Sequence, residues 1–438
     1  MSTLPLDLWD RKYKTHQLSI HGLIAYNKAK YDQYRKLYLK GLYPLKKIQP
    51  LLRVHETLDQ LGSVNDFQRS HAVYGMVEDL KEYKETWVIA LVDHTKKIYI
   101  SCKKDQQGAS SLVKGVFVGF ILNLVPKEKD KISENSLEEF VSLQSSRARY
   151  YVKKIVYPPK IFRPKRPPLN SGVVLVGDIH VGAHTHLELD FLNFIEWVNS
   201  QRDLGYMILA GDSLDGRNVY PSHDKGLKIK SIQMQAHALG KSLAALRKDI
   251  QLIMIMGNHE CVGTRREPHI WPSALKDILN YYNKNILFVS NPGYVRIGQY
   301  NFLLYHGASA DPLIARCSAL SYEDPTTVNE LLVKYRNLCP VSDKIPLMPT
   351  PHLYHLIPED TDYLITGHIH RQGRKLLQGG LQVVSCGTWQ HITPFQARLG
   401  FKPHYAVADV VYPGSPEKDK TLSFKSNNTD LFRHEKVL

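Results

Sequence analysis

Residues 173–180 read Val-Val-Leu-Val-Gly-Asp-Ile-His, and this stretch decides the fold of the chain. Four apolar residues, most of them β-branched, run into a glycine. Such a short unbroken apolar run is typical of a strand buried on both faces of a parallel sheet. Because residues two apart on an extended backbone point the same way, Asp178 and His180 leave the strand end on one side. The pair is a candidate half of a metal site, although Asp-x-His also arises often by chance.

Downstream of this stretch, apolar strands alternate with amphipathic helices, which indicates an α/β domain with a largely covered sheet. The predicted strands are residues 173–176, 206–210, 252–256, 302–305 and 363–366. The predicted helices are residues 188–201, 227–249 and 273–283.

Each of the five strands ends in a polar turn that contains glycine and metal-binding side chains. The turns are Gly177-Asp178-Ile179-His180, Gly211-Asp212-Ser213-Leu214-Asp215, Gly257-Asn258-His259-Glu260, His306-Gly307 and Gly367-His368-Ile369-His370. Chemistry in open α/β sheets gathers outside the carboxyl ends of the strands, so we expect these turns to converge. Oxygen and imidazole donors without thiolate suit Mn, Fe, Zn or Ni, and one bridging carboxylate can hold two ions about 3.5–4 Å apart. The alternative for any single histidine, among 20 in the chain, is a surface or core residue.

The ordered motifs G-D-x-H, G-D-x-x-D, G-N-H-E, H-G and G-H-x-H resemble the calcineurin-like metallophosphoesterase superfamily over about residues 171–410. The resemblance implies a two-sheet α/β domain with two divalent metal ions, Mn first, and Fe, Zn, Ni or Mg as alternatives. The implied ligands of one ion are Asp178, His180 and His370. The implied ligands of the other are Asn258, His306 and His368, with Asp212 as the bridge.

The same resemblance assigns two roles beside the metals. His259 would face the phosphate and either stabilise the transition state or protonate the leaving oxygen. Asp215 would orient a ligand or His259 from outside the metal shell. Glu260 stands where the family often has Asp, which weakens a pairing of His259 with this carboxylate but not metal binding.

Residues 66–157 have a different, β-rich character. Strand-like runs occupy residues 70–77, 86–92, 97–102, 116–122 and 150–157, with room for a short helix at 106–114 and a capping-box pattern from Ser136 to Glu139. Five strands with a helix after the third predict a small Greek-key barrel of the OB type. Trp87, Tyr99 and Phe117 are expected to fill the barrel, with a base-stacking platform as the alternative.

The remaining segments are distinguished by composition. Residues 1–65 form a basic, tyrosine-rich region predicted to be helical, because Tyr31, Tyr34 and Tyr38 share one helical face. Packing of these tyrosines against another domain is preferred to nucleic-acid contact. Residues 158–168 form a stiff Pro-rich basic linker, residues 169–414 the phosphoesterase-like domain, and residues 415–438 a polar tail or edge strand. The candidate nucleic-acid contacts in the linker are Lys160, Arg163, Lys165 and Arg166.

The net charge of +15 is concentrated in the first part of the chain. Residues 1–170 contain 30 Lys and Arg against 17 Asp and Glu, an excess of 13, whereas residues 171–438 contain 27 against 25. This asymmetry favours a polyanionic partner on the N-terminal part, and a solubility surplus is the alternative.

Other classes of protein are disfavoured by the composition. The N-terminus lacks the apolar core of a signal peptide, and no apolar run approaches the ~18 residues of a membrane span. The five cysteines are odd in number and include no C-x-x-C, which argues against zinc ribbons and disulfide frameworks. We therefore expect a cytoplasmic, nucleoid-associated protein without membrane contact.

A narrower resemblance comes from segments between and beyond the five turns. They are Asp215-Gly216-Arg217-Asn218-Val219-Tyr220-Pro221, Phe288-Val289-Ser290-Asn291-Pro292, Tyr305-His306-Gly307-Ala308-Ser309 and Gly387-Thr388-Trp389-Gln390. With the order barrel, linker, phosphoesterase domain, they resemble the small subunit of archaeal family-D DNA polymerases. The region before the barrel is shorter than expected for that family, so whatever a longer one does is expected to be absent.

The narrower resemblance implies a 3′–5′ proofreading exonuclease that hydrolyses the terminal phosphodiester of DNA in a heterodimer with a large polymerising subunit. A sliding clamp is a further candidate partner. One alternative is a non-catalytic scaffold, like the regulatory B subunits of eukaryotic replicative polymerases. The others are a stand-alone phosphatase or phosphodiesterase and an end-processing repair nuclease.

Overall fold

The computed structural model describes residues 35–36, 49–52, 54, 70–126, 148–260, 267, 269–341, 356–398 and 400–426. The helix expected to begin near Ser136 and nearly all of residues 1–65 lie outside this part of the chain. Among the described residues, every helix is too short or too polar to cross a membrane.

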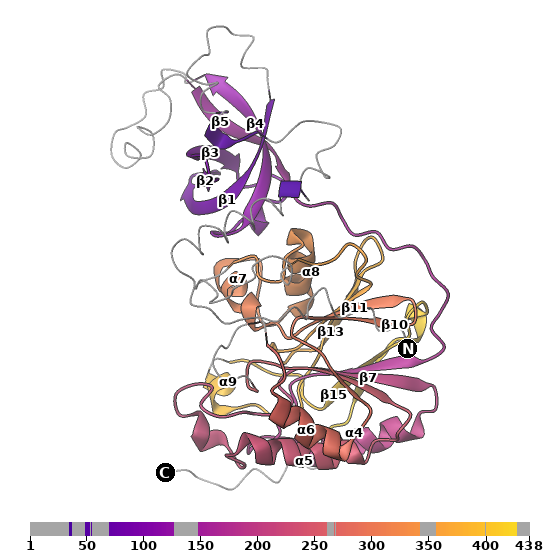
Figure 1. The fold of residues 1–438 in the computed structure, drawn as a ribbon. Helices are drawn as coiled ribbons and strands as arrows, with labels where there is room; N and C mark the ends of the chain where they lie inside the picture. Colours follow the sequence, from indigo (N-terminus) through magenta and orange to yellow (C-terminus); the bar gives the residue numbers. More distant parts are fainter. Residues whose placement is uncertain are drawn as a thin grey trace.

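The N-terminal domain is a closed barrel of five strands (Figure 1). The strands pair in the order β1-β2-β3-β5-β4, and their bounds are β1 Ser70–Tyr83, β2 Thr86–Val92, β3 Lys97–Lys103, β4 Phe117–Pro126 and β5 Ala148–Val156. A 3₁₀ helix, η3 (Ala109–Ser111), follows β3. The OB-type barrel predicted from the sequence is confirmed. Strand β1 is longer than predicted, because it pairs with β4 in its first half and, across a register shift, with β2 in its second.

The barrel core is mostly aliphatic, and its buried aromatic residues, Phe120 and Tyr150, differ from the expected ones. On β3, Ile98 and Ile100 are buried while Tyr99 between them is only half-buried, since successive side chains point to opposite sides of the barrel wall. Trp87 and Phe117 are also half-buried. Trp87 therefore packs against the barrel core as expected, whereas Tyr99 and Phe117 form part of the barrel wall outside that core.

The second domain contains two sheets that pack face to face (Figure 1). One has the order β16-β15-β6-β7-β8-β9, with bounds Lys420–Ser423, Val407–Val411, Gly172–Val176, Leu204–Ala210, Gln251–Ile255 and Ile286–Phe288. The other has the order β10-β11-β12-β14-β13, with bounds Gly293–Ile297, Tyr300–Tyr305, Tyr363–Thr366, Gln382–Ser385 and Gly373–Leu376. The two-sheet fold class is confirmed, and residues 420–423 of the polar C-terminal segment form an edge strand.

Helices cover the outer face of each sheet. Helices α4 (Glu188–Ser200), α5 (Ile232–Ala244) and α6 (Ser273–Tyr282) pack on the six-stranded sheet. Helices α7 (Asp311–Arg316) and α8 (Pro325–Tyr335) lie between the five-stranded sheet and the barrel (Figure 1), and α9 (Pro394–Arg398) lies near the C-terminus. Strand β6 is buried on both faces as predicted: Val174 and Val176 contact the helix side, and Val173 and Leu175 the second sheet.

Helix α5 is shorter than the predicted 227–249. It begins only at Ile232, because the Ser231 side chain accepts a hydrogen bond from the Met234 N–H and caps the helix. The residues before it are extended, and the N–H groups of Lys228 and Ile229 donate to the Gly182 carbonyl instead.

The linker is fastened to the second domain by its own basic residues. Arg163 and Arg166 form ion pairs of 2.7 and 3.0 Å with the buried carboxylate of Asp362. Lys160 hydrogen-bonds to Gln378, whereas Lys165 is exposed. Three of the four predicted nucleic-acid contacts, Lys160, Arg163 and Arg166, thus have a structural partner in the chain.

The barrel and the second domain share one continuous apolar cluster. Lys334 of α8 donates to the Ser111 hydroxyl at 2.9 Å and lies 4.1 Å from the centre of the Tyr157 ring. These contacts place the barrel on the α7–α8 side of the second domain (Figure 1).

Candidate metal centre

The five polar turns meet outside the carboxyl ends of β6, β7, β8, β11 and β12, as the strand arrangement requires. Five of the predicted metal-site residues have left-handed backbone conformations with φ between 48° and 66°: Asp178, His180, Asp212, His368 and His370. Such conformations cost about 1–3 kcal/mol each and gather where function demands them. Gly257 allows the closest approach, since a Cβ there would lie 2.0 Å from Oδ1 of Asp212.

One group of donors comprises Asp178, His180 and His370, all buried, with their ligand atoms within 4.8 Å of one another. Nε2 of His180 faces Nε2 of His370 at 3.1 Å, and the latter lies 3.4 Å from Oδ1 of Asp178. Two imidazole nitrogens that face each other beside a carboxylate form a cluster that a cation would satisfy.

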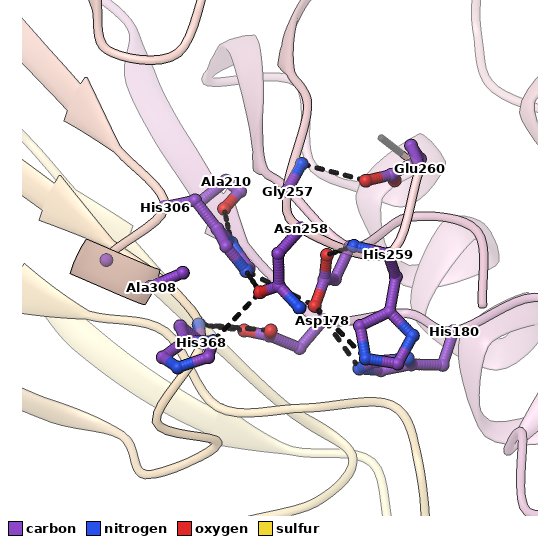
Figure 2. A network of polar contacts seen from close by, with 12 residues as sticks. Asp178, His180, Ala210, Gly257, Asn258, His259, Glu260, His306, Ala308 and His368 are labelled. Atoms are coloured by element: carbon purple, nitrogen blue, oxygen red, sulfur yellow. Dashed lines mark hydrogen bonds and ion pairs between the residues drawn. The ribbon is translucent and has the colours of Figure 1, made fainter. Parts of the chain in front are cut away.

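A second group comprises Asp212, His306 and His368, and the amide of Asn258 lies among them (Figure 2). Oδ1 of Asn258 lies 3.0 Å from Nε2 of His306 and 3.0 Å from Nδ1 of His368. Oδ2 of Asp212 is 3.2 Å from Nε2 of His306 and 3.9 Å from Nε2 of His180. This oxygen therefore faces both groups of donors.

The electrostatic potential at the candidate metal centre favours bound positive charge. Although burial would raise the pKa of Asp212, the neighbouring His306 and His259 hold it well below its usual range. Burial opposes the charged form of His306 as well, but Asp212 raises the pKa of His306 well above its ordinary value. Oxygen and imidazole donors in a negative field fit divalent cations, and the described residues supply that chemistry without thiolate.

Three of the histidines are oriented by contacts through their second ring nitrogen. Nδ1 of His180 lies 2.8 Å from Oδ1 of Asp215, and Nδ1 of His306 lies 2.9 Å from the Ala210 carbonyl. Nε2 of His368 lies 3.0 Å from Oδ1 of Asp311. Each acceptor holds a proton on the outer nitrogen, so the inner nitrogen keeps its lone pair for a metal.

His259 lies at the edge of the two groups, with its ring 4.6 Å from that of His180. Its Nδ1 donates to the Asp215 carbonyl at 2.7 Å, and its backbone N–H donates to Oδ1 of Asp212 at 2.8 Å. Burial would lower the pKa of His259, but Asp212 and then Asp215 raise it to about 9. Asp215 thus contacts both His180 and His259.

Glu260 does not pair with His259. Its carboxylate accepts the backbone N–H groups of Leu214 and Gly257, at 2.9 and 2.8 Å, and so ties the second turn to the third (Figure 2). Burial, reinforced by Asp212, raises the pKa of Glu260 to about 7. The side chain of Glu260, which is longer than the Asp often found here in the family, therefore joins the second and third turns.

Several supporting residues were not identified from the sequence. Asp311 orients His368, His223 contacts Oδ2 of Asp215 at 3.1 Å, and Glu267 accepts the N–H groups of residues 307–309. The partners of Asp311 and Glu267 are 57 and at least 40 residues away, so periodicity gives no signal for these two residues. The Gly387–Gln390 segment was singled out in the sequence by its resemblance to the polymerase small subunits. In the structure its Thr388 hydroxyl donates to the Asp178 carbonyl at 2.7 Å.

The four linker cations are not brought to the metal centre. Arg163 and Arg166 bond to Asp362, which precedes β12, whereas His368 follows the other end of that strand. The linker therefore contacts the amino end of β12, opposite the turns that converge.

Comparison with known proteins identifies relatives of the chain. The profile of the calcineurin-like phosphoesterase family matches residues 172–372. The DNA polymerase II small subunit of Methanocaldococcus jannaschii is 34% identical over 311 residues, or 66% of this chain and 51% of that protein. The protein of the same name from Pyrococcus furiosus is 27% identical over 400 residues (87% and 62%), and that from Methanothermobacter thermautotrophicus 27% over 414 residues (91% and 78%). The chain spans about half to three quarters of the length of these curated relatives.

Proposed function

Because residues 172–372 match the calcineurin-like phosphoesterase family and the chain is similar to archaeal DNA polymerase II small subunits, we propose that it is the small, proofreading subunit of such a polymerase, with 3′–5′ DNA exonuclease activity. The observation that carries the proposal is the position of Asp212, whose Oδ2 faces both groups of donors. A shared carboxylate between two sets of ligands suits in-line attack on a phosphodiester.

In this proposal the donors named above hold two divalent ions, Mn²⁺ first. Asp178, His180 and His370 would hold one ion, Asn258, His306 and His368 would hold the other, and Asp212 would be available to both. The bound ions would polarise the phosphate and lower the pKa of the attacking water.

The protein's own contribution to the reaction centres on His259. Its Nδ1–H is occupied by the Asp215 carbonyl, which leaves Nε2 as the nitrogen that can exchange a proton with substrate. Water adds to phosphorus and releases one proton to solvent, and the bond from phosphorus to the 3′ oxygen of the preceding nucleotide breaks. That oxygen takes a proton from His259, which is protonated again from solvent. The products are a nucleoside 5′-monophosphate and a DNA strand shorter by one nucleotide.

The test is digestion of a 5′-labelled primer with a mismatched 3′ end, in Mn²⁺, by the full chain alone and with its large subunit. We expect Asp212→Ala and His259→Ala to lose at least about a hundredfold in rate, because a positioned acid contributes 10²–10⁴-fold. His94→Ala, a change at an exposed barrel histidine, is the matched control. A wild type inert in both forms, or variants as active as the control, would refute the proposal.

Elemental analysis of the purified protein separates this function from a scaffold role. An exonuclease of this kind should retain divalent metal in stoichiometric amount, and Asp212→Ala should lose it. A scaffold should carry none in either form.

A further inference from the structure

The loop that follows β7 is fixed against the candidate metal centre at Gly216. Gly216 has φ of 69°, and a Cβ there would lie 1.9 Å from the His259 carbonyl oxygen. The fully buried side chain of Gln235 on α5 accepts the Gly216 N–H at 2.8 Å and donates to its carbonyl at 2.9 Å. These contacts fix the backbone of the loop where it passes the candidate metal centre.

The same loop presents an aromatic ring beside the candidate catalytic histidine. The ring of Tyr220 packs 4.6 Å from the ring of the buried His223, and it lies 6.5 Å from the ring of His259. Tyr220 is nevertheless 39% exposed. On either side of it, Asn218 and Ser222 have positive φ values of 55° and 67°, which are uncommon for residues other than glycine. A rigid, strained loop that exposes a large ring next to the reacting centre suits ligand contact better than solvent exposure alone.

The surrounding segment is basic. Residues 217–230 contain one acidic residue and four exposed cations: Arg217, Lys225, Lys228 and Lys230. Arg217 pairs with Asp224 at 3.2 Å and Lys228 with Glu188 at 3.8 Å. The segment lies at the centre, because the N–H groups of Lys228 and Ile229 donate to the carbonyl of Gly182, two residues after His180. An aromatic face among cations is the arrangement that binds single-stranded nucleic acid, with the ring against a base and the cations along the phosphates.

We propose that Tyr220 stacks on the nucleobase of the terminal nucleotide, and that the basic segment 217–230 contacts the phosphates of the same strand. This inference rests on the proposed function, since it places the terminal phosphodiester at the metal centre. Every base offers a π-face, so the contact recognises the presence of a base and not its identity. Tyr220 is thus a positioning residue that selects a strand end with a base over a baseless phosphodiester.

The test compares two 5′-fluorescent single strands that differ only at the 3′ end, one with a normal nucleotide and one with an abasic analogue. Binding to the full chain is measured in EDTA, so that it does not depend on turnover. Wild type should bind the base-bearing strand about tenfold more tightly, and Tyr220→Phe should keep this ratio. Tyr220→Ala should bring the ratio close to one, whereas Tyr281→Ala, a change at an exposed tyrosine of α6, should leave it unchanged.

A wild type with no preference, or a Tyr220→Ala variant that keeps it, would overturn the inference. In the nuclease assay with Mn²⁺, Tyr220→Ala should raise KM for the base-bearing strand and change kcat little. A chain that shows the binding ratio but never hydrolyses DNA would refute the proposed function and leave the stacking contact standing. A chain that hydrolyses DNA without the ratio would do the reverse.

Discussion

Replacement of Asp311 by alanine should weaken metal binding although Asp311 is not itself a proposed ligand. Its Oδ1 lies 3.0 Å from Nε2 of His368 and keeps the proton on that nitrogen, so that Nδ1 faces Asn258. Without this acceptor, His368 can turn or adopt the other tautomer, which has no lone pair toward the centre.

The size of the effect follows from exposure. Loss of an outer partner of a metal-binding histidine typically costs 10–100-fold in metal affinity or activity. The side chain of Asp311 is 33% exposed, so water can replace part of the lost contact. We therefore expect the low end, about tenfold in Kd for Mn²⁺, or about 1.4 kcal/mol. Asp311→Asn keeps an acceptor oxygen and should lie between wild type and alanine.

The assay is equilibrium dialysis against Mn²⁺ with elemental analysis, together with nuclease rate as a function of Mn²⁺ concentration. The rate of Asp311→Ala should return close to wild type at saturating Mn²⁺, a recovery that simple misfolding would not show. The control is Glu330→Ala, which removes an exposed carboxylate from α8. If Asp311→Ala binds Mn²⁺ within twofold of wild type, Asp311 does not orient His368 and the reasoning fails.

Two further predictions concern the linker and a buried carboxylate. Arg163→Ala should lower the free energy of unfolding by about 1–3 kcal/mol in urea titrations, because it removes a charged partner of Asp362. Lys165→Ala should leave the free energy of unfolding unchanged and weaken DNA binding, because Lys165 is exposed. Equal effects of the two changes on stability and on DNA binding would contradict these different roles. Burial raises the pKa of Asp409 to about 6, so its ionised form is disfavoured in the folded state, and wild-type stability should fall as pH rises from about 4 through 6. Asp409→Asn should remove this pH dependence and raise the free energy of unfolding by about 2–3 kcal/mol at pH 7.5. Parallel curves of stability against pH for the two proteins would contradict the prediction.

The sequence by itself determined the order of the strands along the chain and predicted which side chains gather at the candidate metal centre. Apolar runs such as residues 173–176 indicate a strand buried on both faces. A polar turn after each run indicates that a functional site can form at that end of the strand. These are local signals, because each pattern is contained in a few consecutive residues, although the neighbours that bury the strand are distant in sequence. Helix α5 shows the limit: its period continues to either side, but the Ser231 cap and the bonds of residues 228 and 229 to Gly182 decide where it begins.

Only the tertiary structure decided which side chains form ion pairs and hydrogen bonds with one another. Arg163 looked like a DNA contact because the linker is basic and stiff, yet it meets Asp362, 199 residues away. Asp311 gave no sign of its role, because His368 comes to it from a strand end 57 residues further on. Strand order and the packing of two sheets create such pairs, and neither leaves a trace in local periodicity. The five ordered turns, of which Gly177 to His180 is the first, were therefore needed to indicate a candidate metal centre, while the contacts that orient its histidines depended on the fold.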